Sequence, residues 1–310
     1  MRQAWTQFSF GCACVASALV GVAFAIHGTI RDRIPGLSIL FYATPWPVIA
    51  AGSALLAIYW TRRELRIPAS LFVAITLTAL GFWLALDWQW RQTPGPRGQL
   101  RIVQWNVDRP AWRLDGDLRW LAAQDADIIT IAERHPRRKN TLDRWQAALP
   151  DYQLVPSDGE MLCLVRGTVE SVEEGSLARR SFRNVIHTRV RDHDVTVVQV
   201  DLDGFPPADR SVPLHELALL AGEYRSECLI VLGDFNTPAD SAFFLPLRGI
   251  ATNAFEVAGR GCAATWPVPV PVLSLDQMWT TGRLRAVRCE HFASWRSDHR
   301  AVRAEFDFAP

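Results

Sequence analysis

Two polar side chains directly follow an apolar stretch in the second half of the chain. Residues 229–232 predict a buried strand, which runs into Gly233, Asp234, Phe235 and Asn236. Because side chains two positions apart on an extended chain point the same way, Asp234 and Asn236 share a face and Phe235 points away. A carboxylate and an amide in this position can hold a cation, a water molecule or a phosphate oxygen. The same residues are also usual in a turn that ends a strand, so the rest of the chain must decide between the two interpretations.

Other predicted strands also end in polar residues. Asn106 follows the strand predicted over 100–105, and Glu133 follows the one over 127–132. Asp201 lies in the strand over 195–202, and Asp298 and His299 precede the last strand. Each has a structural explanation of its own, as a turn residue, an exposed ion pair or a surface histidine. Their joint occurrence indicates a site, because sheets of this kind carry reactive groups at strand ends and in the following loops.

The elements that would position these residues begin at Leu100. Short strands there lie between amphipathic helices, which is typical of the α/β class. Helices are predicted over 112–124, 141–149 and 213–224. Strands are predicted over 100–105, 127–132, 152–155, 161–165, 181–190, 195–202, 229–232, 273–279, 284–289 and 300–306.

The first ninety residues have a different character. Three stretches, 8–26, 37–60 and 67–86, contain no charged residue, and each has about the 20 apolar residues that a membrane-spanning helix needs. We therefore predict an all-α, three-helix transmembrane region over 1–90, in which Pro45 and Pro47 kink or interrupt the second helix. A cleaved signal peptide explains only the first stretch, and buried helices of a soluble protein are the other alternative. Residues 91–99 predict a linker to a domain over 100–310.

Arginines between these stretches set the predicted orientation. Placing Arg62, Arg63 and Arg66 in the cytoplasm puts the N-terminus there too. Three crossings then place the domain on the periplasmic or extracellular side of a bacterial inner or plasma membrane, although Arg91, Arg97 and Arg101 favour the opposite side. A lipid bilayer is thus a predicted partner, and no protein partner can be inferred. The net charge of +1 gives no indication of nucleic-acid binding.

Five short motifs occur in order along the domain. Together they resemble the endonuclease/exonuclease/phosphatase family, the group of DNase I-like nucleases and related phosphodiesterases, over about residues 100–308. Each motif is weak alone, but the ordered set is specific. The resemblance implies a two-sheet α/β sandwich with its site at one edge of the sheets. The motifs are VQWN at 103–106, DIITIAE at 127–133, GDFN at 233–236, LD at 275–276 and SDH at 297–299.

The resemblance implies a metal site. Glu133 would be the main ligand of a divalent cation, Mg²⁺ or Mn²⁺, and Asp298 would lie near it. Asn106 would help to place the metal or a phosphate oxygen. A phosphodiester is anionic and resists attack, so a hard cation that neutralises the developing charge suits this chemistry. Mg²⁺ prefers carboxylate and water oxygens, so one or two protein carboxylates suffice.

The resemblance also implies catalytic roles for four residues. Asp234 would orient or activate the attacking water, and Asn236 would hold the phosphate. His299 would bind the phosphoryl oxygens or accept a proton, with Asp276 fixing its ring. A histidine held by a carboxylate has a fixed tautomer and a raised basicity, which suits either role.

Two positions depart from the family pattern. Ala132 stands where the family usually has Gln, and Asp201 stands where many members have a His that helps the leaving group. Asp201 can do that work only with a raised pKa, which a crowded acidic site can provide. The alternatives are an extra metal ligand, a mark of lost activity, or an ordinary Asp at a strand end.

The predicted function is therefore a membrane-anchored, divalent-metal-dependent phosphoesterase, a phosphodiesterase or nuclease-like hydrolase. Its substrate would be nucleic acid, a phospholipid head group or a small organic phosphate. The alternative is a catalytically inactive member that acts as a binding or sensing module at the membrane. A transporter is disfavoured, because no charged residue within the three stretches marks an ion path.

Overall fold

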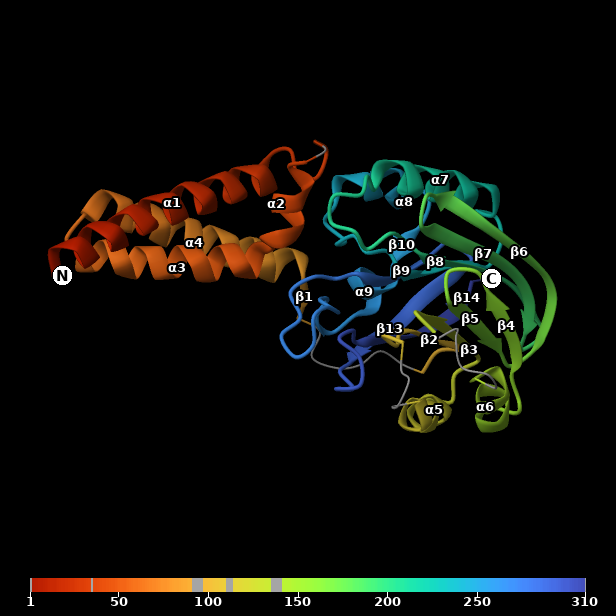
Figure 1. Ribbon diagram of the computed structural model, residues 1–310. Coiled ribbons are helices and arrows are strands. Elements are labelled where there is room, and N and C mark those ends of the chain that lie inside the picture. Colours follow the sequence, from red (N-terminus) through yellow and green to blue (C-terminus); the bar gives the residue numbers. More distant parts are fainter. Residues whose placement is uncertain (1, 35, 91–96, 110–113, 135–140, 310) are drawn as a thin grey trace. The chain divides into compact units, whose positions relative to one another are not determined.

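Helices make up the N-terminal unit, Met1–Trp88 (Figure 1), of a computed structural model that describes every residue except 1, 35, 91–96, 110–113, 135–140 and 310. They are α1 (Arg2–Gly28), α2 (Ser38–Ala43), α3 (Trp46–Arg62) and α4 (Arg66–Leu86). Most of the predicted linker falls on residues 91–96, which lie outside the described residues.

The helix predicted over 37–60 is interrupted. α2 ends at Ala43, and α3 begins after Pro45 with Pro47 in its first turn. The interruption at these prolines was predicted, since proline cannot donate the hydrogen bond that would continue a helix. α3 is left with 17 residues. Among the described residues, two helices, Trp5–Gly28 and Arg66–Leu86, are long and apolar enough to cross a membrane. Two of the three predicted membrane-spanning helices are therefore supported.

Small side chains bring these helices together. Six of the twelve residues in the buried cluster of this unit are alanine, so the backbones can approach closely. Large aliphatic side chains face outward instead, among them Leu19, Leu55 and Leu77, each more than half exposed. An apolar outer surface over a small-residue interior is the arrangement expected of helices that pack in lipid.

Two six-stranded sheets form the C-terminal unit, Gln89–Pro310, and confirm the predicted α/β sandwich. We name the sheet of order β10-β12-β9-β8-β7-β6 sheet I, and the sheet of order β13-β14-β2-β3-β5-β4 sheet II. Sheet I contains β6 (Thr168–Ala178), β7 (Ser181–Val190), β8 (His193–Asp201), β9 (Leu229–Asp234), β10 (Thr252–Asn253) and β12 (Asp276–Thr280). Sheet II contains β2 (Leu100–Asn106), β3 (Ile128–Ala132), β4 (Gln153–Ser157), β5 (Met161–Val165), β13 (Leu284–Phe292) and β14 (Ala301–Phe308). The short strands β1 (Trp88–Gln89) and β11 (Gly261–Cys262) lie outside both sheets.

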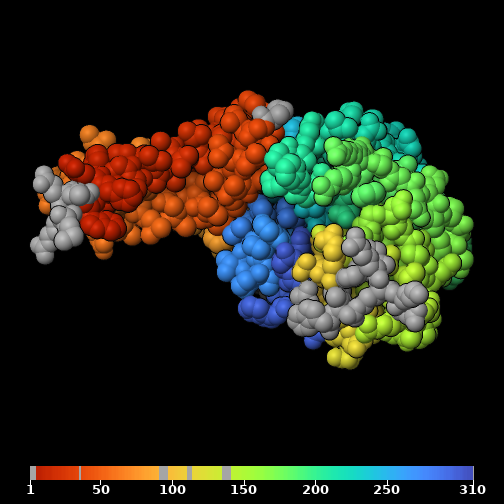
Figure 2. All heavy atoms as spheres, viewed as in Figure 1, coloured from red at the N-terminus to blue at the C-terminus, as the bar shows by residue number. Residues whose placement is uncertain are grey.

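Helices cover the outer faces of the sandwich. α5 (Leu114–Ala122) and α6 (Thr141–Ala148) lie over sheet II, and α7 (Ser211–Glu223), η1 (Ala242–Phe244) and α8 (Leu245–Arg248) lie over sheet I (Figure 1). A short helix, α9 (Ala254–Ala258), packs near β13. Figure 2 shows the same face with all heavy atoms as spheres, in which the segments of β6, β7 and α7 are coloured green to teal.

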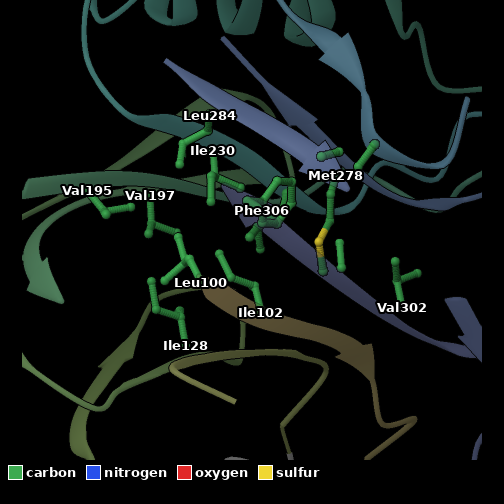
Figure 3. Close-up of a cluster of buried hydrophobic side chains, with 14 of the residues drawn as sticks. Leu100, Ile102, Ile128, Val195, Val197, Ile230, Met278, Leu284, Val302 and Phe306 are labelled. Carbon is green, nitrogen blue, oxygen red and sulfur yellow. The ribbon is translucent and has the colours of Figure 1, made fainter. Parts of the chain in front are cut away.

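The main core lies between the sheets. Leu100, Ile102 and Ile128 of sheet II meet Val197 and Ile230 of sheet I, and all five are buried (Figure 3). Strands buried on both faces read as continuous apolar runs, which is why 229–232 and 161–165 were recognisable from sequence. This packing fixes the edge at which the polar strand ends lie.

Gly233 is required where β9 reaches that edge. Its φ is +147°, and a Cβ built on it would lie 1.9 Å from the backbone oxygen of Val200 on the neighbouring strand. We expect Gly233→Ala to destabilise the chain by about 3 kcal/mol, through overpacking against backbone and strain at this φ. That loss corresponds to a decrease in Tm of roughly 6–12 °C, measured by tryptophan fluorescence of the full chain in detergent.

Gly282→Ala is the matched control for this prediction. No atom lies within 4 Å of the position that its Cβ would take, and its φ is not in the left-handed region. Its Tm should stay within about 2 °C of the unaltered chain, as for most surface substitutions. Equal Tm values for the two variants would show that β9 can shift to accept a side chain at Gly233.

Candidate active site

Three carboxylates stand abreast at one edge of sheet I. Asp201 is the last residue of β8 and pairs with Asp234, the last residue of β9. Asp234 also pairs with Asp276, the first residue of the antiparallel strand β12. Because residues at paired positions of neighbouring strands place their side chains on the same face, the register brings together groups that are far apart in the sequence.

Sheet II contributes an amide and a fourth carboxylate. Asn106 ends β2 beside Ala132 of the parallel strand β3, and Glu133 follows β3 directly. The buried Asn106 amide nitrogen donates to Asp234 Oδ2 at 2.8 Å and to Glu133 Oε1 at 3.2 Å. Its amide oxygen accepts from the backbone N–H of Asp108 at 3.0 Å. Asn106 thus joins the edges of the two sheets, with its amide NH2 group engaged by the two carboxylates.

A buried histidine is held by the third carboxylate. His299 Nδ1 lies 2.7 Å from Asp276 Oδ2, and His299 Nε2 lies 3.9 Å from Asp234 Oδ2 and 3.9 Å from Asp298 Oδ1. Burial lowers the pKa of His299, but the carboxylates of Asp276, Asp234 and Asp298 together raise it to about 10. His299 is therefore an imidazolium at neutral pH, which favours the binding of phosphoryl oxygens over the acceptance of a proton.

Two of the carboxyl groups abreast on sheet I have raised pKa values. Burial raises the pKa of Asp234 to about 6, with a further contribution from Asp276, against the lowering effects of His299, Asn106 and its own turn. Burial also holds the pKa of Asp201 well above its usual range, and the charges of Asp234 and Glu133 add to the effect. Asp234 can therefore accept a proton near neutral pH. Asp201 can carry a proton there, as it must if it is to help the leaving group in place of a histidine.

Glu133 is held from a second side by an arginine that the sequence did not single out. Arg109 Nη1 contacts Glu133 Oε2, and Arg109 Nε donates to Glu160 Oε2 at 2.8 Å. The backbone N–H of Arg109 also donates to the carbonyl of Glu133 at 3.0 Å. Its position three residues after the Asn106 motif was the only signal in the sequence.

The remaining two predicted residues lie at the border of this group. Asn236 has a φ of 47° and donates its backbone N–H to Asp234 Oδ1 at 2.9 Å, while its amide nitrogen donates to the carbonyl of Leu202 at 2.8 Å. Asp298 is half exposed and accepts from Trp266 Nε1 at 2.9 Å. The structure therefore brings all eight predicted residues to one edge of the sandwich, while their chemical roles remain predictions.

The donor set at this edge fits a hard divalent cation. Oxygen ligands dominate, and one oxygen of the buried Asp276 carboxylate has no hydrogen-bond partner among the described residues. Asp234, Asp276 and His299 offer atoms within 4.8 Å of one another, but His299 Nδ1 and Asp276 Oδ2 already bond to each other. The guanidinium of Arg109 stands beside Glu133 as a cation would. Glu133 and the cluster of Asp234, Asp276 and His299 are the groups among the described residues that could hold such a cation.

Comparisons with known proteins agree with this architecture. The sequence profile described as the Endonuclease/Exonuclease/phosphatase family matches residues 103–299. No curated protein matches the sequence.

Three solved structures are similar in fold. TDP2 from D. rerio, complexed with a single-strand DNA product, is 16% identical, covers 67% of this chain and 98% of its own, and has a TM-score of 0.56. The 3′ phosphatase NExo from Neisseria, bound to a product DNA hairpin, is 20% identical over 67% of this chain and 100% of its own, with a TM-score of 0.56. A family protein from Bacteroides vulgatus is 17% identical, covers 68% of this chain and 99% of its own, and has a TM-score of 0.56. At these identities the likeness shows the fold alone.

Proposed function

Because the chain belongs to the endonuclease/exonuclease/phosphatase family, we propose that it is a divalent-metal-dependent phosphoesterase, a phosphodiesterase or nuclease-like hydrolase anchored to a membrane. The observation that carries the proposal is the row Asp201, Asp234 and Asp276, tied through Asn106 to Glu133 and through Asp276 to His299. Buried carboxyl groups with raised pKa values beside a histidine support proton transfer at this site.

Glu133, together with Asp298 and Asn106, would hold Mg²⁺ or Mn²⁺. When bound, such an ion supplies positive charge that stabilises the charge developing on the phosphoryl oxygens. His299, as an imidazolium, would donate its Nε2–H to a phosphoryl oxygen. The Asn236 amide holds a further oxygen, so that the phosphorus is fixed before attack.

Two carboxyl groups carry the protons. Asp234 accepts a proton from the water whose oxygen attacks phosphorus, and its pKa of about 6 suits a base near neutral pH. The bond from phosphorus to the leaving oxygen breaks, and that oxygen takes a proton from the acid form of Asp201, whose pKa is raised. The carboxyl at position 201 therefore replaces the His that the sequence comparison led us to expect.

The N-terminal helices would hold this site at a bilayer. α1 and α4 have the length and composition of spanning helices. We propose that α3, with 17 residues and no charge before Arg62, is a third crossing. Three crossings place the C-terminal unit on the periplasmic or extracellular side. An alkaline phosphatase reporter fused after Pro310 should be active, and an active cytoplasmic reporter with an inactive alkaline phosphatase would reverse this orientation.

The metal requirement is a direct test of the proposed function. The full chain in detergent should hydrolyse bis-p-nitrophenyl phosphate with Mn²⁺ or Mg²⁺, and chelation by EDTA should abolish turnover reversibly. Glu133→Gln should lower kcat/KM at least about a hundredfold, because it removes the charged ligand. Glu223→Gln, an exposed change on α7, is the control and should have no effect.

A substrate panel separates the two candidate functions. Nucleic acid, phospholipid and small organic phosphates should be offered to the folded, metal-loaded chain. Turnover of one class identifies the substrate. No turnover of any phosphoester would support the alternative, a binding or sensing module at the membrane.

A further inference from the structure

The side chain of Arg109 is half exposed, yet its backbone and its guanidinium are both held in defined positions. Asp108 and Arg109 have φ values of 49° and 45°, so two successive non-glycine residues adopt the left-handed region. Residues other than glycine rarely adopt such conformations, which persist only where the surroundings enforce them. Here the backbone N–H of Arg109 donates to the carbonyl of Glu133, and the turn directs the side chain back over that residue. The conformation of this loop therefore holds the guanidinium of Arg109 at Glu133.

The guanidinium has two separate attachments. Nη1 contacts Glu133, and Nε donates to Glu160 Oε2 at 2.8 Å. The backbone of Glu160 is held in place, because its carbonyl accepts from the backbone N–H of Arg134 at 2.7 Å. If the contact with Glu133 is released, the bond to Glu160 keeps the guanidinium at the mouth of the site. The fork of Nη1 and Nη2 is then free to bind another anion.

A divalent cation and Arg109 compete for the same carboxylate. Glu133 has one oxygen facing Asn106 and the other facing Arg109. A metal ion at Glu133 would repel the guanidinium and take over its charge-neutralising contact. The displaced guanidinium then lies within reach of a phosphate, whose oxygens match the planar fork of arginine better than any lysine would.

We propose that Arg109 is a metal-released phosphate clamp: it pairs with Glu133 in the metal-free protein and turns to the phosphoryl oxygens of the substrate when a divalent cation takes Glu133. The inference rests on the proposed function for its substrate, but its metal-binding half stands independently. According to this proposal, Arg109 weakens the binding of the metal and strengthens the binding of the substrate. Few other roles would predict effects of opposite sign on these two affinities.

Binding of Mn²⁺ tests the first half without any turnover. The full chain in detergent is titrated with Mn²⁺, and free Mn²⁺ is followed by electron paramagnetic resonance. Arg109→Ala should bind Mn²⁺ about fivefold more tightly than the unaltered chain, the amount expected from removing one partly exposed competing ion pair. Arg109→Lys keeps the competing charge and should bind Mn²⁺ with nearly unchanged affinity.

Arg189→Ala is the matched control. Arg189 is 52% exposed against 53% for Arg109, and it pairs with Asp194 at 2.9 Å, outside the site. It removes the same charge from the same unit and should leave Mn²⁺ affinity unchanged. Tighter binding in both variants would mean that net charge alone is responsible, and this would overturn the proposal, as would unchanged or weaker binding in Arg109→Ala.

Steady-state kinetics on bis-p-nitrophenyl phosphate at saturating Mn²⁺ test the second half. Arg109→Ala and Arg109→Lys should both raise KM about tenfold or more, because lysine cannot reproduce the two-point contact. An unchanged KM in Arg109→Ala would overturn the clamp. If the unaltered chain shows no turnover, the proposed function fails while the Mn²⁺ titration still decides whether Arg109 and the metal compete for Glu133.

Discussion

We expect Asp234→Asn to lower kcat about a thousandfold at neutral pH, with the fold and the Mn²⁺ affinity retained. This is the largest loss of activity that we expect from the exchange of a single side-chain atom. The amide cannot accept the proton of the attacking water, and general-base catalysis contributes roughly 10²–10⁴-fold. Asn106 can still donate to the new side-chain oxygen, as it donates to Asp234 Oδ2 now. kcat is measured with bis-p-nitrophenyl phosphate, and the fold by circular dichroism.

The stability of the same variant provides a second readout. Burial raises the pKa of Asp234 to about 6, so the charged form is disfavoured in the folded chain. A neutral amide removes this cost, but its NH2 group would face the backbone N–H of Asn236, which now donates to Asp234 Oδ1, so Tm should change little. Asp194→Asn, an exposed change in the β7–β8 hairpin, should alter neither kcat nor Tm. A kcat within tenfold of the unaltered value would exclude Asp234 as the base.

The pair of Asp276 and His299 gives the second large effect. We expect His299→Ala and Asp276→Asn each to lower kcat about 10²- to 10³-fold, since one removes the imidazolium and the other the carboxylate that holds it at 2.7 Å. Groups that act as one unit show strongly non-additive losses. The double variant should therefore be no slower than His299→Ala alone. Multiplied losses in the double variant would show that the two residues act separately.

The pH profile of Asp276→Asn distinguishes this role from mere support of the fold. The imidazolium form of His299 is present below its pKa of about 10 and is lost as the pH rises through that value. The Asp276 carboxylate contributes to this increase, so its removal lowers the pKa of His299. The alkaline loss of kcat should then move toward neutral pH. An alkaline limb at the same pH in both proteins would contradict the imidazolium assignment.

The strands that bury continuous apolar stretches could be predicted from the sequence. β5 was predicted with its observed limits, and the hairpin of β7 and β8 was predicted to within a few residues. β6 was missed because it carries Glu170, Glu173 and Glu174 along an exposed edge strand, where no apolar alternation marks it. The loss of continuity at Pro45 was foreseen, but not that it would shorten α3 to 17 residues.

The residues of the site could be predicted, but not their mutual arrangement. Strand-end position and motif order selected Glu133, Asp234 and His299. That Asp201, Asp234 and Asp276 stand abreast depends on strand register, which is set by packing across both sheets and is not written in any one segment. Arg109 was overlooked because a surface arginine in a loop has no distinguishing pattern until its two carboxylate partners are known.

The double attachment of Asn106 has a consequence for the biogenesis of the protein. Its amide reaches from β2 to Asp234 on the other sheet, and its carbonyl accepts from Ser297, two residues before His299. Strand β14, which follows His299, lies between β13 and β2 in sheet II and comes after every other strand along the chain. A ribosome-bound nascent chain that ends before β14 therefore has its N-terminal helices and its aspartates but no assembled centre. The proposed hydrolysis would begin only after both sheets have docked, and so only after the proposed membrane anchor has been made.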